Sequence, residues 1–270
     1  MKLVGYEHAG AAGVGMLTDE GVLPTGHTDM IGLIRSGAEV RATGGPLRGH
    51  RLTAPLPRPG KIFGSGINYA SHFTENPKAV MPEEPGFFVK FASSVIGPDD
   101  TIVLPSPDAD VDYEVELAVV IGRSGMDIAP ADALGHVFGY TLVNDISARA
   151  IQFRHMQTPL GKGCDTFCPM GPAIVTPDEI PDISALRLTS HVNGEIRQDA
   201  TCAEMLFDIP TLVAHASRAI TLEPGDVITT GTPAGCGTFR EPPLWLAPGD
   251  EVEIAADAIG RLRNPVAAGW

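Results

Sequence analysis

Two glutamates, Glu114 and Glu116, open an apolar run in the segment DYEVELAVVI, residues 112–121. The run predicts a strand, and because side chains of a strand alternate between its two faces, both carboxylates should project on one side. Like charges that close raise each other's pKa and cost stability unless a cation lies between them. The pattern is therefore typical either of a cation-binding pair or of an exposed edge strand with both glutamates in water.

A third carboxylate, Asp145, follows a second predicted strand over residues 137–143 and precedes the helical pattern SARAIQ. Asp145 is either an N-terminal helix cap or the third member of an all-oxygen site with the two glutamates. Such a site suits Mg²⁺, Mn²⁺ or Ca²⁺ rather than Zn²⁺, because those ions prefer hard oxygen ligands.

A lysine between two glycines, Lys162 in the tripeptide GKG, is a candidate partner for this site. Three carboxylates and one divalent cation leave a net negative charge, so a neighbouring cation would help to admit an anionic ligand. The flanking glycines allow the backbone to approach a ligand closely. The alternative interpretation is a solvated loop lysine.

His72 and Glu75 lie three residues apart in NYASHFTE, residues 68–75, and share one face if this segment is helical. A carboxylate that orients an imidazole keeps it a competent general base near neutral pH, although such pairs also occur by chance on surface helices. The next segment, NPKAVMPEEPG, residues 76–86, is rich in proline and polar residues, as expected of a mobile flap. The segment TTGTPAG, residues 229–235, suits the lining of a pocket but lacks the lysine and spacing of a phosphate loop.

These residues need a scaffold that brings them together, and the composition favours short strands. The chain has 270 residues, 43% of them apolar, and its 31 glycines and 24 prolines favour many short elements joined by turns. We therefore expect a mainly β protein with short helices, of the α+β class. Predicted strands cover residues 61–69, 86–91, 111–122, 137–145, 173–177, 186–194, 226–235 and 251–260. Predicted helices cover residues 30–36, 147–156, 211–221 and a short segment after Asn68.

The segment RLTAPLPRPGK, residues 51–61, carries proline at alternate positions and is typical of an extended linker. We place a domain boundary there. A small N-terminal domain is expected over residues 1–58 and a catalytic domain over residues 59–270.

The chain is acidic, with 33 aspartates and glutamates against 19 lysines and arginines and a formal charge of −14. This charge repels nucleic acid and anionic membrane surfaces, so neither is an expected partner. The sequence has no apolar stretch of membrane-spanning length and no signal-peptide pattern, from which we expect a cytoplasmic protein. Four cysteines without Cys-x-x-Cys spacing indicate reduced thiols rather than a disulfide framework.

Taken together, the motifs resemble the fumarylacetoacetate hydrolase family in order and spacing. The resemblance runs from residue 61 to the C-terminus and is carried by INYASH-x-x-E, FFVKFASSVIGP, VDYEVELAVVIG, GYTLVNDISARAIQ, GKGCDTFCPMGP, VNGE-x-RQ, L-x-PGDVITTGTPAG and PGD-x-VE-x-x-x-x-x-IGRL. It implies a mixed β-sandwich roll behind a small N-terminal domain. It also implies a homodimer.

The resemblance assigns roles to residues of this chain. The implied ligands of Mg²⁺ or Mn²⁺ are Glu114, Glu116 and Asp145. The implied catalytic residues are His72, Glu75 and Lys162. The implied substrate-binding residues are Arg149, Gln152 and Thr232.

One departure from the family pattern bears on the substrate. The founding hydrolase carries a substrate-contacting tyrosine four positions beyond the glutamine that matches Gln152, and this chain has Met156 there. A thioether cannot hold a distal carboxylate as a phenol can. Fumarylacetoacetate itself is therefore disfavoured as the substrate, while the metal chemistry is unaffected.

The resemblance implies a metal-dependent hydrolase of acylpyruvate-type 2,4-diketo acids, small anionic substrates whose carbon–carbon bond is cleaved to give pyruvate, or its derivative, and an acid. In this mechanism the metal acts as Lewis acid, His72 deprotonates a water, and Lys162 with Gln152 stabilises the developing oxyanion. Oxaloacetate decarboxylation or tautomerisation and hydroxymuconate-type isomerisation use the same enolate chemistry and stay open as alternatives. A non-catalytic protein with a structural Ca²⁺ is a further alternative, and it would need neither a base nor Lys162.

Overall fold

The computed structural model describes residues 1–76, 79–154 and 158–269. It is mainly β with short helices, as the sequence predicts. The strands are β1 (Lys2–His8), β2 (Ala11–Thr18), β3 (Gly21–Pro24), β4 (Arg51–Thr53), β5 (Ile62–Ser65), β6 (Phe87–Lys90), β7 (Val95–Ile96), β8 (Ile102–Leu104), β9 (Val111–Asp112), β10 (Val115–Ile121), β11 (Val137–Asn144), β12 (Ser147–Ala148), β13 (Cys168–Val175), β14 (Arg187–Val192), β15 (Glu195–Thr201), β16 (Val227–Thr229), β17 (Glu251–Ala256) and β18 (Gly260–Ala268). The α-helices are α1 (Met30–Ser36), α2 (Ala70–Glu75), α3 (Arg149–Gln152), α4 (Pro159–Lys162) and α5 (Ile209–Ser217).

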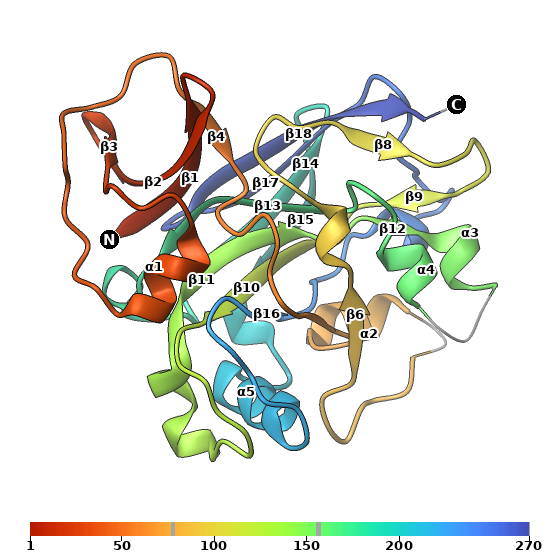
Figure 1. The fold of residues 1–270 in the computed structure, drawn as a ribbon. Helices are drawn as coiled ribbons and strands as arrows, with labels where there is room; N and C mark the ends of the chain where they lie inside the picture. Colours follow the sequence, from red (N-terminus) through yellow and green to blue (C-terminus); the bar gives the residue numbers. More distant parts are fainter. Residues whose placement is uncertain (77–78, 155–157, 270) are drawn as a thin grey trace.

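The larger of two main sheets carries β10 near its centre (Figure 1). The strand order is β3-β2-β1-β13-β11-β10-β16-β5-β6, with β4 on β1 and β7 on β13. β10 lies between β11 and β16 and is antiparallel to both. β16 and β5 run parallel, with Thr229 opposite Gly64. The segments that follow these two neighbouring strands therefore start side by side at the same end of the pair.

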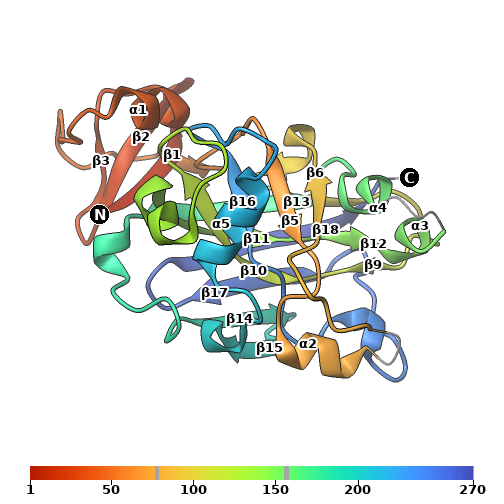
Figure 2. The same cartoon turned by 90° about the horizontal axis from the view of Figure 1, so that it is seen from below.

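The smaller sheet, with strand order β15-β14-β17-β18-β8, packs against the larger one as a second layer (Figure 2). Leu117 of β10 belongs to one buried cluster with Leu188 of β14 and Ile254 of β17. On the other face of β10, Val120 packs in a second cluster with Leu33 of α1. Because alternate side chains of β10 enter two cores, this strand is fully buried, and the two layers form the predicted sandwich roll.

The helices agree in part with the sequence prediction. α1 spans the predicted residues 30–36, and the Asp29 side chain caps it by accepting from two backbone N–H groups. The pattern predicted as a helix over 147–156 first forms β12, which pairs with β9, and the helix begins only at Arg149. The pairing of Ser147 with Asp112 explains the delay, since a residue in a β-ladder cannot also have helical backbone. Residues 155–157 of this prediction lie outside the described residues.

The segment 51–61 differs from the predicted linker. It begins with β4, which pairs with β1, and Leu56 is fully buried in the core shared with β10. β1 itself pairs with β13, so the N-terminal strands extend the large sheet. The division into domains at residue 58 stays a prediction. Among the described residues, the helices all fall short of the length and apolar character needed to cross a membrane.

Candidate active site

Three carboxylates converge where β10 begins and β11 ends. Glu114 immediately precedes β10, Glu116 is its second residue, and Asp145 follows β11. The antiparallel register pairs Val115 with Asn144, which sets Glu114 beside Asp145, and the backbone N–H of Asp145 donates to the Glu114 carbonyl at 2.9 Å. Carboxylate oxygens of all three acids lie within 4.8 Å of one another.

This geometry decides between the alternatives that the sequence leaves open. Glu114, Glu116 and Asp145 are 4%, 1% and 0% exposed, which excludes a solvated edge strand. Asp145 is no helix cap, because the residue that precedes α3 is Ala148. The predicted strand over 111–122 is interrupted at residues 113–114, so Glu114 lies in the break between β9 and β10, and the two glutamates still reach the same cluster.

Buried cations face these carboxylates. The ammonium of Lys162 lies 2.5 Å from Glu114 Oε2 and 2.5 Å from Asp145 Oδ2. The ammonium of Lys90, at the end of β6, lies 2.5 Å from Asp145 Oδ1 and also donates to the backbone carbonyl of Lys162. Lys162 was predicted as a partner of the carboxylates, with a solvated loop lysine as the alternative, and the structure places it as the last residue of α4, 3% exposed. The solvated-lysine alternative is therefore excluded.

Arg149 connects the carboxylate cluster to one further buried acid, Asp112. Its Nε and Nη2 atoms lie 3.0 and 2.8 Å from Asp112 Oδ2, and Nη2 also lies 2.5 Å from Glu114 Oε1. Its Nη1 donates to the side-chain oxygen of Gln152 at 3.0 Å, which leaves the amide N–H groups of Gln152 for other partners. Buried charged hydrogen bonds of this kind hold a side chain in one orientation.

The burial and the charges shift the pKa values of the cluster in opposite directions. Burial, with the neighbouring Asp145 and Glu114 charges, raises the pKa of Glu116 well above its ordinary value. Burial also opposes ionisation of Glu114, but Arg149 and Lys162 outweigh it and hold the pKa of Glu114 well below the ordinary value. The ion pairs of Lys162 likewise outweigh its burial and raise the pKa of its ammonium. Glu116 is thus the carboxylate most in need of a further positive charge.

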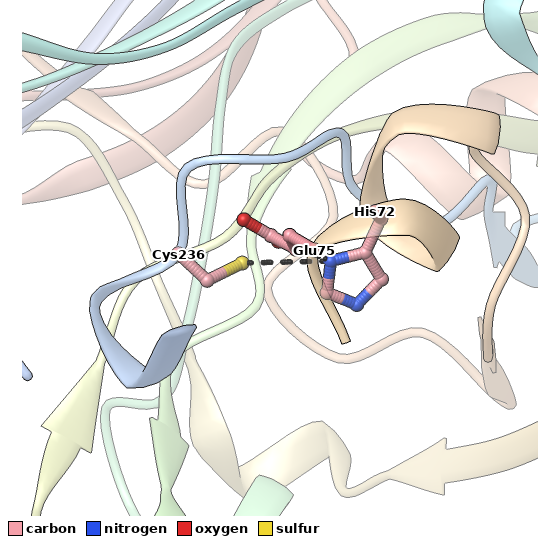
Figure 3. Close-up of side chains that lie close together, drawn as sticks. All are labelled: His72, Glu75 and Cys236. Carbon is pink, nitrogen blue, oxygen red and sulfur yellow. Dashed lines mark hydrogen bonds and ion pairs between the residues drawn. The ribbon is translucent and has the colours of Figure 1, made fainter. Parts of the chain in front are cut away.

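The predicted pair of His72 and Glu75 forms on α2. His72 Nδ1 lies 2.7 Å from Glu75 Oε1, with side-chain exposures of 12% and 17%. Glu75 Oε2 accepts the backbone N–H of Gly235 at 2.8 Å, so both oxygens of the carboxylate are engaged. Figure 3 shows this pair beside Cys236, whose Sγ lies 4.0 Å from His72 Nδ1. Both contacts involve Nδ1, and the other ring nitrogen, Nε2, is directed away from Glu75 and Cys236.

The loop after β16 contributes through its backbone. Gly231 has a φ of +82°, a region open chiefly to glycine, and its N–H donates to Glu116 Oε2 at 3.1 Å. The Thr232 hydroxyl donates to the Val115 carbonyl at 2.9 Å and accepts from Gln198 Nε2 at 2.7 Å. Its proton is therefore engaged within the protein, and Thr232 fixes the loop against β10.

A cavity of about 210 Å³ lies over this cluster. Seven of the nine predicted site residues line it, namely His72, Glu114, Glu116, Arg149, Gln152, Lys162 and Thr232. The other two, Glu75 and Asp145, contact lining residues directly. A larger cavity of about 510 Å³ lies elsewhere and has a mainly apolar lining without any predicted site residue. Met156, and Pro77 and Lys78 of the predicted flap, lie outside the described residues.

The carboxylate triad fits a divalent cation. It offers three hard oxygen donors within 4.8 Å of one another, in a buried site where Glu116 lacks a full counter-charge. Such donors suit Mg²⁺ or Mn²⁺. Glu114, Glu116 and Asp145 would hold the ion, and it would supply a Lewis acid facing the cavity.

Sequence reasoning missed three residues of the site: Lys90, Asp112 and Gln198. A signal existed for each. In the predicted strand, Asp112 is two residues before Glu114 and so shares its face with both glutamates. Lys90 is a charged residue inside the apolar run FFVKF. Gln198 belongs to the motif VNGE-x-RQ, and its side chain, 1% exposed, accepts the Val115 N–H at 2.9 Å.

Comparisons with known proteins agree with this geometry. The family model "Fumarylacetoacetate (FAA) hydrolase C-terminal" matches residues 61–267. The human protein named oxaloacetate tautomerase FAHD2A, mitochondrial, is 47% identical over 215 residues, which cover 79% of this chain and 68% of that protein. A fumarylacetoacetate hydrolase structure from Exiguobacterium antarcticum is 38% identical, with a TM-score of 0.90 and 99% of each chain covered. A 5-carboxymethyl-2-hydroxymuconate delta-isomerase structure from Mycobacterium smegmatis is 37% identical, with a TM-score of 0.85 over 99% of this chain and 100% of that one.

The motifs, the two-sheet fold and the buried triad thus coincide in one chain, and the matched region contains every predicted site residue. The chain belongs to the fumarylacetoacetate hydrolase family.

Proposed function

We propose that the protein is an enzyme that interconverts the enol and keto forms of oxaloacetate, a tautomerase of a small anionic keto acid. The observation that carries the proposal is the 2.7 Å contact of His72 with Glu75 beside a cavity that Glu114 and Glu116 of the carboxylate triad also line. This arrangement puts a base beside a site for a divalent cation. The similarity to a protein named oxaloacetate tautomerase supports the choice of substrate.

The tautomerisation moves one proton between C3 and the oxygen on C2. In the enol-to-keto direction, His72 Nε2 takes the hydroxyl proton and returns it to C3, so the imidazole ends unchanged. Glu75 holds Nδ1 at 2.7 Å, which fixes the ring and stabilises its charged form while the proton resides on Nε2.

The remaining residues bind and orient the substrate. Mg²⁺ or Mn²⁺ on the triad would polarise the substrate's carboxylate and oxo oxygens as a Lewis acid. Lys162 and Arg149 make the cavity less negative. The amide N–H groups of Gln152, which donate to none of the described residues, suit a carboxylate at the far end of the substrate.

A second candidate reaction is the hydrolysis of an acylpyruvate, in which His72 would deprotonate a water that attacks the C4 carbonyl and the C3–C4 bond would break. The similarity to the Exiguobacterium hydrolase supports it. Isomerisation of a hydroxymuconate-type diacid, supported by the Mycobacterium structure, needs the same groups. Oxaloacetate decarboxylation needs the metal site but no base to activate a water. These reactions differ in which proton moves and which bond breaks. The shape of the cavity controls the choice among them, because it decides which substrate fits.

The test is to incubate the protein and Mg²⁺ separately with enol-oxaloacetate, an acylpyruvate and an unsaturated hydroxymuconate-type diacid. We expect loss of the enol absorbance of oxaloacetate well above its spontaneous rate, with slower turnover of the others. His72→Ala should lower the enzymatic rate by roughly 10² to 10⁴, the usual contribution of a general base, and Glu75→Gln should reproduce part of this loss. His8→Ala, on β1 and outside the cavity lining, is the matched control.

Faster acylpyruvate cleavage than tautomerisation would replace the proposal with the hydrolase alternative. A comparison of reactions in His72→Ala adds a mechanistic check, because decarboxylation of oxaloacetate needs no attacking water and should fall much less than hydrolysis. Equal losses in both reactions would mean that His72 positions the substrate rather than transferring a proton.

A further inference from the structure

A second group of metal-binding side chains lies beside the carboxylate triad and shares no residue with it. It consists of His72, Glu75 and Cys236, whose ligand atoms all lie within 4.8 Å of one another (Figure 3). Cys236 is fully buried and follows the loop after β16, and the two other residues lie on α2. The proposed function uses the histidine and the glutamate but gives the cysteine no role.

The donor set differs in chemistry from the triad. An imidazole nitrogen, a carboxylate oxygen and a thiolate sulfur together suit Zn²⁺ and similar thiophilic divalent ions, whereas three carboxylates suit Mg²⁺ or Mn²⁺. Three protein ligands with a fourth position for water is a usual zinc coordination. The two groups should therefore select different metals from the same solution.

The distances are close to those a zinc ion requires. Around a tetrahedral zinc, N···O and N···S ligand separations are about 3.3 and 3.6 Å from the usual bond lengths. The structure has 2.7 Å between His72 Nδ1 and Glu75 Oε1, and 4.0 Å between Nδ1 and Cys236 Sγ. Opening the first contact and closing the second, each by about half an ångström, would bring these two separations to the zinc values. The third separation, between the glutamate oxygen and the sulfur, is within 4.8 Å and would have to reach about 3.6 Å.

Backbone contacts hold the two sides of the group together. Glu75 Oε2 accepts the N–H of Gly235, the residue before Cys236, at 2.8 Å. Ser71 Oγ accepts the N–H of Ala234 at 3.3 Å, so α2 is joined twice to the loop that carries the thiol. His72 also lines the cavity, so one of the three ligands borders the space from which an ion would enter.

We propose that His72, Glu75 and Cys236 form a regulatory Zn²⁺ site at which zinc inhibits the enzyme. The thiol of Cys236 donates to Glu114 Oε1 at 3.7 Å. Zinc would break this contact, displace the thiol proton to solvent and bind the sulfur as thiolate. It would also take the Nδ1 lone pair of His72, so the ring's single proton moves to Nε2. That nitrogen then has no lone pair with which to accept a substrate proton. This inhibitory consequence rests on the proposed role of His72 as the base, whereas zinc binding itself does not.

Metal binding can be tested with Co²⁺ as a spectroscopic probe of the full-length protein, in the presence of excess Mg²⁺ to fill the triad. We expect a near-ultraviolet thiolate-to-cobalt charge-transfer band, and competition by Zn²⁺ should remove it. Cys236→Ser should abolish the band. Cys202→Ser, another buried cysteine, and Glu116→Gln, which damages the triad, should both retain it.

X-ray absorption of the zinc-loaded wild-type protein provides a measurement that needs no variant to fold. It should show one sulfur in the zinc coordination shell. A shell of nitrogen and oxygen alone, or a cobalt band that survives in folded Cys236→Ser, would overturn the proposal.

Inhibition is measured as each variant's rate relative to its own zinc-free rate. Cys236→Ser should need at least about tenfold more zinc for half-inhibition than the wild type, because a thiolate ligand is lost. Equal sensitivity would show that zinc acts at the triad, and the regulatory proposal would be wrong. If the cobalt band forms but no oxaloacetate turnover exists, the zinc site stands and the proposed function fails.

Discussion

At the scale of single residues, the site is a balanced cluster of buried charges. Four carboxylates, Asp112, Glu114, Glu116 and Asp145, face the three cations Lys90, Arg149 and Lys162. The ionised cluster has one negative charge in excess, and a divalent ion would turn this into one positive charge in excess, which suits an anionic substrate. The cations also fix the carboxylates in place, because a buried ion pair offsets the cost of removing both charges from water only when its geometry is good.

The cluster predicts a specific stability effect for Lys90, whose side chain is fully buried against Asp145. Lys90→Met leaves that carboxylate with one cation fewer and should lower the free energy of unfolding by about 3–5 kcal/mol, the usual cost of breaking a buried pair on one side. Urea denaturation measures this loss. Arg261→Met, which breaks an exposed ion pair with Glu253, is the control and should cost under about 1 kcal/mol. A comparably small loss for Lys90→Met would contradict the argument.

The raised pKa of Glu116 predicts a pH dependence for metal binding. The ion needs the carboxylate, so below the raised pKa it must displace a proton, and Mg²⁺ affinity should increase with pH until Glu116 is ionised without metal. Titration calorimetry in buffers of different ionisation enthalpy would report the released proton. Mg²⁺ affinity that does not change with pH above the ordinary pKa of a glutamate would contradict this assignment.

The same shift predicts how the metal-free protein responds to pH. Because the folded state holds the Glu116 proton more tightly than the unfolded state, its contribution to stability is present at acid pH and is lost as pH rises through the raised pKa. Bound Mg²⁺ should remove that loss. The thermal midpoint measured across pH in chelator and in Mg²⁺ should therefore diverge toward higher pH.

At the scale of elements, α2 is a short helix whose position depends on its neighbours. Its cap residue Tyr69 makes no side-chain capping bond, and the six-residue helix buries none of its own side chains. An isolated helix of this length is unstable in water. Asn68 supplies the anchor, since its amide donates to the carbonyls of Phe207 and Thr230 at 3.1 and 2.8 Å and accepts the Phe207 N–H at 2.8 Å.

Removing this anchor should loosen α2 while leaving the sheets folded. Asn68→Ala leaves buried backbone groups without partners, which costs about 1–3 kcal/mol. Native-state hydrogen exchange should show faster exchange over residues 70–75, and the proposed activity should fall with it. Thr74→Ala, which loses a hydrogen bond on the exposed side of the same helix, should change exchange little. Unchanged exchange in Asn68→Ala would show that α2 is held by other contacts.

At the scale of the whole molecule, two sheets form the buried centre, and the pair of His72 and Glu75 lies outside it on α2. β10 and β11 are buried strands between two cores, and they carry the carboxylates. The parallel pairing of β5 with β16 then brings α2 and the loop to Cys236 together, although His72 and Cys236 are 164 residues apart. The proposed metal ligands are thus held by the core, while the proposed base lies on a short helix that depends on its neighbours and can respond to a ligand.

We also expect a homodimer, as the family resemblance implies. Sedimentation at micromolar concentration should give about twice the 28.4 kDa of the chain. A single species with the mass of one chain at micromolar concentration would contradict this expectation.

The sequence by itself determined the fold class and most of the candidate site. Alternation along a strand put Glu114 and Glu116 on one side, and helical spacing paired His72 with Glu75, because both relations are local and follow from backbone geometry. The composition similarly predicted a mainly β protein of short elements. Where a local pattern had two solutions, as in the helix predicted from residue 147, only pairing with a distant strand chose between them.

The tertiary structure alone decided which charges meet. Lys90 is 55 residues from Asp145, and Cys236 is 164 residues from His72, and no periodicity connects residues so far apart. Their contacts depend on strand order and register, which are fixed by burying two apolar faces at once. For the same reason, the sequence could place Thr232 in a pocket loop, whereas its hydroxyl's engagement with the Val115 carbonyl followed only from the packing of that loop on β10.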